Sequence, residues 1–320
     1  MKLNFSVILV LLVCFIPKLK AEDFPSKAVR LVVPYAPGGG LDVIGRPITQ
    51  KMSERYSVPF LLDNRPGGGT SIGTQIVAKA DPDGHTLLLT LSALTIGPSI
   101  YKNFPYDPIK SFSPVIWIGT SSYILSIHPS VPVKNVRELI NLSRRYPTKF
   151  NYSSTGNGTD THMAAELLKN MAGVQWLHIP FSGGGPAAMA VIGGQVELTV
   201  LPTSFGAPLI KAGRVRALAI CNVSRSTEFP DLPTISESGV PGYSADAWSG
   251  ILAPANTTSK IVNQLNEDIK QIVLSQEYSA LLKSRMVEPV ATSVSHFTRR
   301  IYDDVNKWKN LAKAGHLKLD

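Results

Sequence analysis

Short apolar strand patterns that alternate with amphipathic helix patterns constrain the fold of this chain more than any other feature. The strand patterns lie at residues 29–33, 86–90, 115–118, 124–127, 150–153, 176–179, 196–201 and 215–220. Most lack strict polar–apolar alternation, which is typical of strands buried on both faces in parallel sheets covered by helices. Helical spacing at 161–172, 260–274 and 297–311 predicts amphipathic helices, the last with Ser295 as N-cap and Gly315 just past its end. The alternation predicts an α/β fold.

The first 21 residues have the order of a secretory signal peptide. A basic start at Lys2 precedes an apolar run over residues 5–17, and the small residue Ala21 closes the segment. The run is shorter than the ~20 apolar residues that span a bilayer, so a membrane anchor is the less favoured alternative. We therefore predict cleavage after Ala21. Cleavage removes three lysines and no acid, which lowers the formal charge from +9 to +6, and it leaves Cys221 as the single cysteine.

Composition and charge exclude several classes of protein. With 17% charged and 44% hydrophobic residues, the chain has the balance of a globular protein rather than of a disordered, collagenous or coiled-coil one. Two cysteines cannot build a disulfide framework or a cysteine-based zinc site. No block of basic residues is longer than Arg144-Arg145 or Arg299-Arg300, so we expect no nucleic-acid partner.

The length of 320 residues predicts two domains. No repeat or low-complexity linker separates them, which favours domains joined by strand crossovers, with one domain built from both chain ends. The crossovers are predicted near residues 123–127 and 246–252. The predicted division is a signal peptide at 1–21, lobe 1 at 22–124 and 248–320, and lobe 2 at 125–247.

Four glycine-rich loops, at residues 34–40, 64–71, 153–159 and 181–186, lie between predicted strands and helix starts. Such loops suit anion binding, because the backbone can approach a ligand closely and the next helix start adds partial positive charge. A single loop of this kind is more often only a tight turn. Four of them favour a shared site, since parallel α/β sheets bind ligands at the carboxyl ends of their strands. No complete nucleotide-binding glycine motif is present, so a small carboxylate fits better than a nucleotide.

Motifs for catalysis or metal binding are incomplete. Ser182 and Ser204 lack the glycine two positions earlier that a nucleophile elbow needs. The pair of His162 and Glu166 is interpreted as a helix start rather than as half of a metal site. Asp42 fits a helix N-cap better than a general base. We expect no catalytic residue, no metal and no cofactor. An exported serine-type hydrolase of small esters and an anion-binding structural protein without a mobile cleft stay open as alternatives.

Several longer stretches carry a resemblance to a known family. The clearest are VPYAPGGGLDVIGR at 33–46, DNRPGGG at 63–69 and DPDGHTLL at 81–88, and further stretches follow at 156–162, 180–186, 194–196, 211–219 and 233–243. They resemble the Bug family, the substrate-binding proteins of tripartite tricarboxylate transporters. The resemblance implies a periplasmic, two-lobed binding protein of type II, with a mostly parallel sheet flanked by helices in each lobe. It also implies a monomer that captures a small organic carboxylate for membrane transporter subunits or a sensor, without catalysis.

The resemblance further implies which residues line the cleft between the lobes. Lobe 1 contributes the first glycine loop and positions after later strands, and lobe 2 contributes the third and fourth glycine loops. The implied ligand-binding residues are Tyr35, Ala36, Gly38, Gly39, Asp42, Ser71, Ser92, Thr95, Ser153, Gly156, Thr159, Phe181, Ser182 and Gly183. We expect backbone N–H groups and hydroxyls of this set, rather than Arg46 or Arg65, to hold the carboxylate.

Three positions depart from the family pattern. His85 stands where relatives usually have Tyr, which is interpreted as a surface change. Pro47 falls inside the first helix pattern and removes one backbone hydrogen bond, so this helix is expected to begin late or to bend. Leu201-Pro202 occupies a place where relatives often carry Asp, and the loss of that acid argues against a ligand with an ammonium group.

Overall fold

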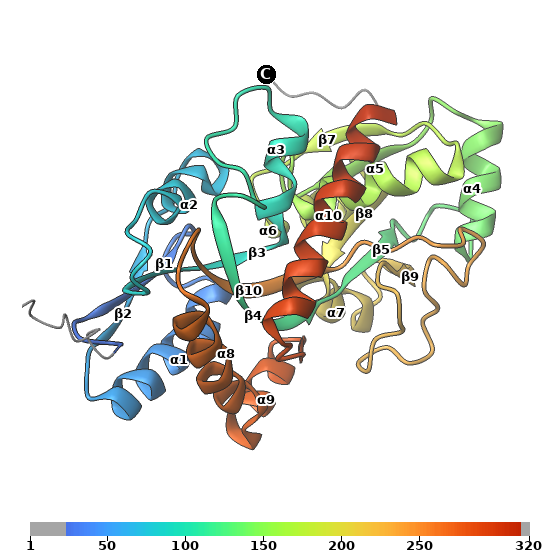
Figure 1. Cartoon of the computed structure of the whole chain (residues 1–320). Coiled ribbons are helices and arrows are strands. Elements are labelled where there is room, and N and C mark those ends of the chain that lie inside the picture. The colour runs from blue at the N-terminus through green and yellow to red at the C-terminus, as the bar shows by residue number, and fades with distance from the viewer. Residues whose placement is uncertain (1–23, 315–320) are drawn as a thin grey trace, which may run out of the picture.

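The computed structural model describes residues 24–314. These residues form two α/β lobes, each built on its own β-sheet (Figure 1). The expected two-lobed α/β fold is confirmed. The predicted signal peptide and the predicted helix stop at Gly315 lie outside the described residues.

Lobe 1 is built on a six-stranded sheet with the strand order β11-β4-β10-β3-β1-β2. Its strands are β1 (Val29–Val33), β2 (Phe60–Asn64), β3 (Thr86–Leu91), β4 (Phe112–Ser121), β10 (Ala247–Pro254) and β11 (Val287–Pro289). Its helices are α1 (Gly40–Tyr56), α2 (Ser71–Ala78), α3 (Gly97–Ile100), α8 (Ser259–Leu274), α9 (Gln276–Ser284) and α10 (Val294–Ala314), with 3-10 turns η1 (Gly68–Thr70) and η2 (Ser92–Thr95).

Lobe 2 is built on a five-stranded sheet with the strand order β7-β6-β8-β5-β9. Its strands are β5 (Tyr123–Ile127), β6 (Asn151–Ser154), β7 (Leu177–Pro180), β8 (Leu198–Pro202) and β9 (Arg216–Ile220). Its helices are α4 (Val136–Arg145), α5 (Asp160–Ala172), α6 (Gly184–Ile192) and α7 (Thr203–Lys211).

Both sheets combine parallel strands with antiparallel ones. β2, β1 and β3 run parallel in lobe 1, and β7, β6 and β8 run parallel in lobe 2. β10 is antiparallel to β3 and β4, and β5 is antiparallel to β8 and β9. The antiparallel pairs follow from the way in which the chain connects these strands. β4, β5 and β10 carry the chain between the lobes, and they do so without the helical crossover that two neighbouring parallel strands need.

The chain passes between the two sheets at two places. On the outward path only Ser122 separates β4 from β5, and its carbonyl accepts hydrogen bonds from the backbone N–H (2.9 Å) and the hydroxyl (2.7 Å) of Thr203. On the return path the chain enters lobe 1 at Ala247, the first residue of β10. The predicted lobe boundaries fall inside β5 and just after the start of β10, and they stay a prediction.

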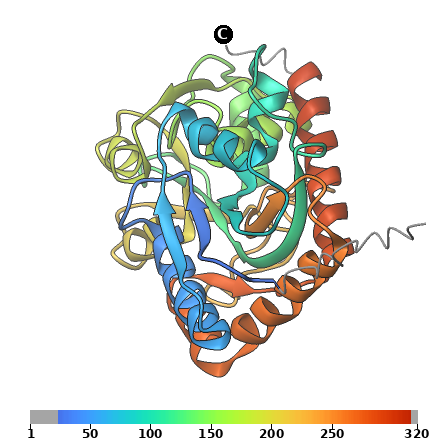
Figure 2. The same cartoon turned by 60° about the vertical axis from the view of Figure 1, so that its left-hand side comes forward.

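Helix α10 runs along one side of the molecule and packs against both lobes (Figure 1, Figure 2). Near its start, Phe297 and Ile301 pack in a core of lobe 1. Near its end, Trp308 and Leu311 pack in the core of lobe 2. The two lobes therefore share α10, which contributes apolar residues to the core of each.

The middle of α10 holds an ion network against the return path. Arg300 lies 2.8 Å from Asp246 and 3.1 Å from Asp304, and Trp248 Nε1 donates a hydrogen bond of 2.8 Å to Asp304. Both acids and the Trp248 ring are buried. Because a buried charge must be paired, this network ties the start of β10 to α10.

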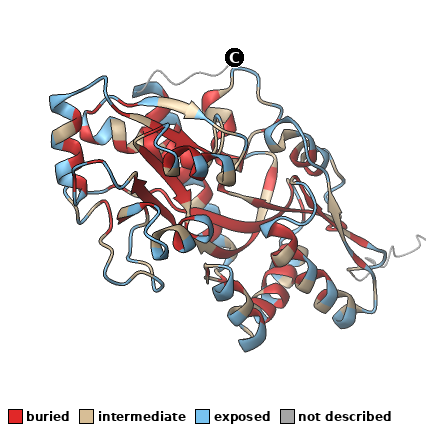
Figure 3. Ribbon diagram, turned by 180° about the vertical axis from the view of Figure 1, so that it is seen from behind, coloured by how far each residue is buried: buried red, intermediate tan, exposed pale blue. Residues whose placement is uncertain are grey.

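Burial follows the layers of the fold. Figure 3 shows buried strands at the centre and helices whose outer faces are exposed. β10 is buried at every residue, and β1 is buried at four of its five residues. Coverage on both faces explains why these strands lack polar–apolar alternation.

Two helix starts differ from the sequence predictions. α10 begins at Val294, so Ser293 rather than Ser295 stands before it, and the Ser293 hydroxyl accepts a hydrogen bond of 3.4 Å from the backbone N–H of His296. α1 begins at Gly40 and continues through Pro47, so the proline does not delay the helix.

His85 is buried, and its interpretation as a surface change was wrong. Its Nε2 accepts a hydrogen bond of 3.2 Å from the backbone N–H of Ser26, and its ring lies edge-on to Phe24 with 5.2 Å between centroids. The imidazole therefore holds the segment that leads into β1 against β3, a long-range contact that a single sequence does not reveal.

Candidate functional site

A cavity of about 390 Å³ opens at the carboxyl end of β1, where lobe 1 faces α7 of lobe 2. Lobe 1 supplies the first glycine loop, the start of α1 and residues near β11, and lobe 2 supplies Ser204. The lining residues are Tyr35, Ala36, Gly38, Gly39, Gly40, Leu41, Asp42, Val43, Ile44, Leu91, Ser121, Ser204, Arg285 and Val287. The cavity thus contains all five predicted site residues of the first loop. Their contact with a ligand stays a prediction.

The carboxylate of Asp42 holds the first glycine loop in place through hydrogen bonds. It accepts hydrogen bonds from Gly38 N–H (2.9 Å), Asn64 Nδ2 (2.8 Å) and Arg46 Nη2 (3.0 Å). Burial by itself would raise the pKa of Asp42, but these three donors hold it below its ordinary value. The carboxylate is therefore ionised and fully engaged, and it shapes the loop around Gly38, whose φ of +83° suits glycine.

The backbone of the same loop offers free donors. Within residues 24–314, no hydrogen bond engages the N–H groups of Gly39 or Gly40, which precede the first turn of α1. These groups lie at the positive end of a helix of 17 residues and line the cavity. A Cβ added at Gly39 would meet only the Ala36 carbonyl oxygen, at 3.5 Å, so the approach to the loop backbone is open.

Ser71, in the second glycine loop, starts α2 but does not line the cavity. The loop instead supports the first one. A Cβ at Gly73 would come within 2.5 Å of the Arg65 carbonyl oxygen and 2.9 Å of Pro34, so Gly73 allows α2 to pack closely against the end of β1.

Ser92 and Thr95 are buried in η2. Thr95 donates its hydroxyl hydrogen to the Ser92 carbonyl at 2.8 Å. Ser92 donates its own to Asp160 Oδ1, on lobe 2, at 2.5 Å. The sequence analysis did not select Asp160. Its position directly after the Thr159 cap was the available signal, because the first turn of a helix beside a glycine loop faces the same cleft.

Asp160 has an unusual environment for a carboxyl group. Burial raises its pKa to about 6, and Asp304 on α10 adds to the rise, while the hydrogen bond from Ser92 and the charge of Lys307 oppose it. The phenols of Tyr35 and Tyr123 also lie near this carboxyl, and its charge contributes to their raised pKa values. Asp160 is therefore a titratable contact between the lobes.

The predicted residues of the third glycine loop use their hydroxyls within lobe 2. Ser153 is fully buried and donates to the Ala187 carbonyl at 2.9 Å. Thr159 caps α5, and its hydroxyl donates to the Gly156 carbonyl at 2.8 Å. Neither hydroxyl hydrogen is left for a ligand in this conformation. Gly156 itself has a φ of +137°, which explains the glycine in this turn.

The fourth glycine loop is more open. Ser182 is exposed, Phe181 is half-buried against the apolar residues of α6 and α7, and Gly183 precedes α6 with a φ of +112°. These three predicted site residues do not line the 390 Å³ cavity. From lobe 2 only Ser204, at the start of α7, does so.

Arg46 and Arg65, the two arginines next to the glycine loops, are both occupied. Arg46 pairs with Asp42, and Arg65 Nε lies 2.9 Å from Asp63.

Arg285, between α9 and β11, lines the cavity instead. The sequence analysis did not select Arg285, Ser204, Ser121 or Leu91, because they come to the first loop only through the packing of distant elements.

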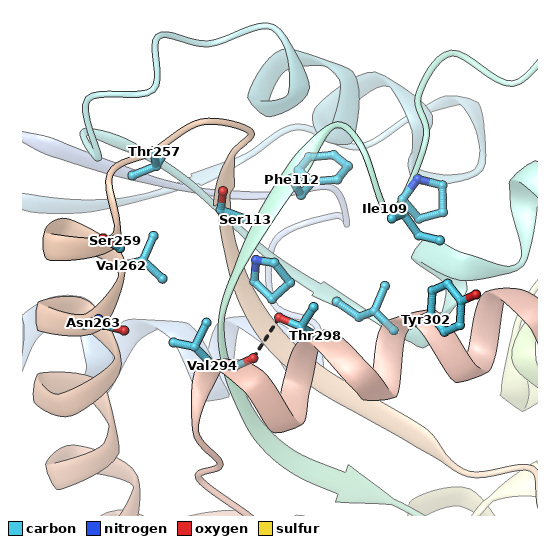
Figure 4. A pocket seen from close by; sticks show the side chains of 13 residues that line it. Ile109, Phe112, Ser113, Thr257, Ser259, Val262, Asn263, Val294, Thr298 and Tyr302 are labelled. Atoms are coloured by element: carbon cyan, nitrogen blue, oxygen red, sulfur yellow. Dashed lines mark hydrogen bonds between the residues drawn. The ribbon is translucent and has the colours of Figure 1, made fainter.

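A second cavity, of about 340 Å³, lies on lobe 1 between α8, α10 and the start of β4 (Figure 4). Its walls are mainly apolar side chains such as Ile109, Phe112 and Val262, and none of its lining residues carries a charge. The Thr298 hydroxyl beside it donates to the Val294 carbonyl at 2.8 Å. This surface offers no charged or backbone donor set comparable to that of the first loop, so we do not assign the carboxylate to it.

Two of the lobe 2 histidines, His162 and His178, form a packed stack rather than a metal site. The rings of His162 and His178 lie 3.9 Å apart between centroids, and Tyr152 stacks on His178 at 4.8 Å. Burial lowers the pKa of His162 to about 4 and that of His178 to about 3. Among the described residues, no group of three or more His, Cys, Asp or Glu side chains is arranged to hold a metal ion.

None of the helices within residues 24–314 is both long and apolar enough to cross a membrane.

Comparison with known proteins agrees with this architecture. The profile of the tripartite tricarboxylate transporter family receptor matches residues 44–317. BugT of Bordetella pertussis is 30% identical over 301 residues, which cover 93% of this chain and 92% of BugT. A Rhodopseudomonas palustris structure with adipate is similar at a TM-score of 0.79 and 33% identity, covering 92% of this chain and 99% of that one. MatC of the same organism, with bound malate, is similar at a TM-score of 0.73 and 28% identity, covering 90% and 99%. The chain therefore belongs to the tripartite tricarboxylate transporter receptor family.

Proposed function

We propose that this chain is a periplasmic solute-binding protein that captures a small organic carboxylate between its lobes and delivers it to membrane transporter subunits or a sensor. One observation carries the proposal. The free N–H groups of Gly39 and Gly40 line a cavity to which both lobes contribute residues. A neutral ligand would leave these donors at the positive end of α1 without an anionic partner.

The energetics of these donors suit reversible capture. A hydrogen bond to a charged group contributes about 1.5–3 kcal/mol, so two or three of them can anchor a carboxylate without a bidentate arginine. The adipate and malate of the two similar R. palustris structures support this class of ligand. The predicted signal peptide supports a periplasmic location.

The two crossings between the sheets are the proposed hinge. Ser122 alone joins β4 to β5, and β10 enters lobe 1 directly, so small backbone rotations there would change the width of the cleft. Solution scattering should show a more compact particle at ligand saturation. Identical free and saturated profiles would contradict hinge closure.

A hydrolase would need a serine–histidine pair that substrate can reach. Ser154 and His178 form a serine–histidine pair, with 2.6 Å between Oγ and Nε2. Ser154 is fully buried, however, and desolvation lowers the pKa of His178 to about 3, which makes its imidazole a poor base near neutral pH. The pair therefore gives no support to the hydrolase alternative.

The experiment that tests the proposal is a thermal-shift screen followed by titration calorimetry. The screen includes succinate, malate, adipate, citrate, butyrate, hexanoate and benzoate. A ligand at 100 times its dissociation constant stabilises the folded protein by about 2.7 kcal/mol, which such a screen detects. Failure of every carboxylate to shift the unfolding temperature would contradict the proposed function.

Gly39→Val locates the site. The new side chain has room beside Ala36 and would block access to the loop backbone. We expect at least a roughly 100-fold loss of affinity with an unchanged unfolding temperature. Gly185→Val is the matched control, because Gly185 also lies at a helix start with open space at its Cβ but does not line the cavity. Wild-type affinity in Gly39→Val would refute the assignment.

A further inference from the structure

Arg285 stands out among the residues that line the interlobe cavity. It is the single Lys or Arg side chain there, and within residues 24–314 its guanidinium makes no ion pair or hydrogen bond. The single acid of the cavity wall, Asp42, is already paired with Arg46. Among the described residues that line the cavity, Arg285 therefore carries the one positive charge without an acidic partner.

The position of Arg285 is set by well-defined backbone. Its N–H donates to the Leu282 carbonyl at 2.9 Å, which closes the end of α9. Two residues later, Val287 pairs with Ser121 across the antiparallel strands β11 and β4. Both Val287 and Ser121 line the same cavity. The root of the Arg285 side chain is thereby fixed beside the outward crossing between the lobes.

The nearest acid along the chain does not neutralise Arg285. Glu288, on β11, accepts a hydrogen bond of 2.5 Å from the hydroxyl of Thr227. The Glu288 carboxylate is thus directed to a different partner, and the guanidinium is available to a ligand.

The wall that the glycine loop and Arg285 share is apolar. Leu41, Ile44, Leu91 and Val287 all line the cavity. Such a surface fits methylene groups, whereas the free N–H groups at Gly39 and Gly40 and the guanidinium fit anionic groups. The arrangement is that of two anion-binding points joined by an apolar wall.

We propose that Arg285 recognises a second anionic group of the ligand, so that the cavity selects a dicarboxylate over the monocarboxylate of the same chain length. The proposal rests on the proposed function and adds the residue that sets specificity. One carboxylate binds at the first glycine loop, the chain follows the apolar wall, and the second carboxylate pairs with the guanidinium. Arg285 supplies no chemistry other than this charge-assisted contact.

Titration calorimetry on matched ligand pairs tests the proposal. The pairs are adipate with hexanoate and succinate with butyrate, measured on the chain that follows the predicted cleavage site after Ala21. We expect the wild type to bind the dicarboxylate at least tenfold more tightly in one or both pairs. In Arg285→Gln that preference should fall to under threefold, with the hexanoate or butyrate affinity nearly unchanged. Arg285→Lys should keep part of the preference, because the charge remains but the planar guanidinium does not.

Lys283→Gln is the matched control. Lys283 is exposed on α9, two residues before Arg285, and does not line the cavity, so its loss changes the net charge equally without touching the proposed contact. We expect wild-type preference in this variant. Equal preference in Lys283→Gln and Arg285→Gln, an undiminished preference in Arg285→Gln, or no dicarboxylate preference in the wild type would each overturn the role of Arg285. Failure of the wild type to bind any carboxylate would instead refute the proposed function.

Discussion

Two aspartates beside the cleft occupy similar places in the sequence and very different surroundings in the fold. Asp42 lies in the first turn of α1 after the first glycine loop, and Asp160 is the first residue of α5 after the third. Asp42 accepts hydrogen bonds from three donors, one of them a guanidinium. Asp160 accepts one side-chain hydrogen bond, from Ser92, and faces Asp304. The pKa of Asp42 is lowered and that of Asp160 is raised to about 6.

The difference shows what each carboxyl does for its lobe. Asp42 is an ionised anchor that shapes the loop whose free N–H groups line the cavity. Asp160 resists ionisation and bonds the opposite lobe through Ser92. The same local pattern, an aspartate at a helix start after glycines, therefore produces an ionised anchor of the loop in lobe 1 and a titratable contact between the lobes in lobe 2.

Removal of the Asp42 carboxylate should have the largest effect. Asp42→Ala leaves the Gly38 N–H and the Asn64 amide without their acceptor. Because each bond to a charged group contributes about 1.5–3 kcal/mol, we expect the free energy of unfolding to fall by about 4 kcal/mol in urea titrations. Arg46→Gln is the control and should cost under about 1 kcal/mol, since the Arg46 side chain is 64% exposed. Equal losses in the two variants would contradict the anchor role.

Asp160→Asn should act in the opposite direction. The folded protein keeps the Asp160 proton between pH 3.8 and about 6, where the unfolded chain has lost it. The ionised aspartate therefore destabilises the fold fully above pH 6 and not below pH 3.8. We expect Asp160→Asn to be more stable than the wild type by about 3 kcal/mol above that window and equal below it. A stability difference that does not change with pH would show that ionisation is not its cause.

His162, in the first turn of α5 with Asp160, should give a pH dependence of the opposite sign. Its Nδ1 accepts a hydrogen bond of 3.0 Å from Gly158 N–H, and burial lowers its pKa from 6.5 to about 4. The unfolded chain takes up the proton first as pH falls below 6.5, so stability is lost through this window. We expect a loss of about 2 kcal/mol by about pH 5 from this group. His162→Gln should remove that part of the slope, and an unchanged slope in urea titrations would count against it.

Arg46→Gln and Arg65→Gln should have the smallest effects on ligand binding. Both arginines pair with acids of lobe 1, Asp42 and Asp63, so neither guanidinium is free to bind a carboxylate. We expect calorimetry to show less than a tenfold loss of affinity, about 1.4 kcal/mol or less. Complete loss of binding in either variant, with the fold intact, would mean that an arginine and not the loop backbone holds the ligand.

The strands that sequence reasoning identified and those that it missed differ in a physical way. All eight predicted strands overlap observed ones, because buried strands of apolar residues leave a local pattern. β2 was missed because only Phe60 of it is buried, at a sheet edge. β10 was missed because Gly250 interrupts its apolar run. That glycine is explained only by the fold, since a Cβ there would come within 2.4 Å of the Phe297 ring.

The residues of the candidate site also fall into those that the sequence could identify and those that it could not. The first glycine loop was recognisable because its exposed backbone requires glycine locally, and Gly38 has the expected positive φ. Ser153 and Thr159 were plausible donors by residue type, yet their hydroxyl hydrogens bond carbonyls within lobe 2. Whether a hydroxyl is free depends on neighbours that a single sequence does not specify.

By itself, the sequence determined the α/β class, the family resemblance and the positions of the glycine loops, because these depend on residue types within a few positions of one another. The tertiary structure alone decided the charge states and the remaining walls of the cavity. Asn64 reaches Asp42 across 22 residues and Ser92 reaches Asp160 across 68. Arg285 joins the first loop from the far end of the chain, through the pairing of β11 with β4. A carboxyl or a guanidinium acquires its role from the dielectric and the partners around it, and folding brings those partners from distant segments.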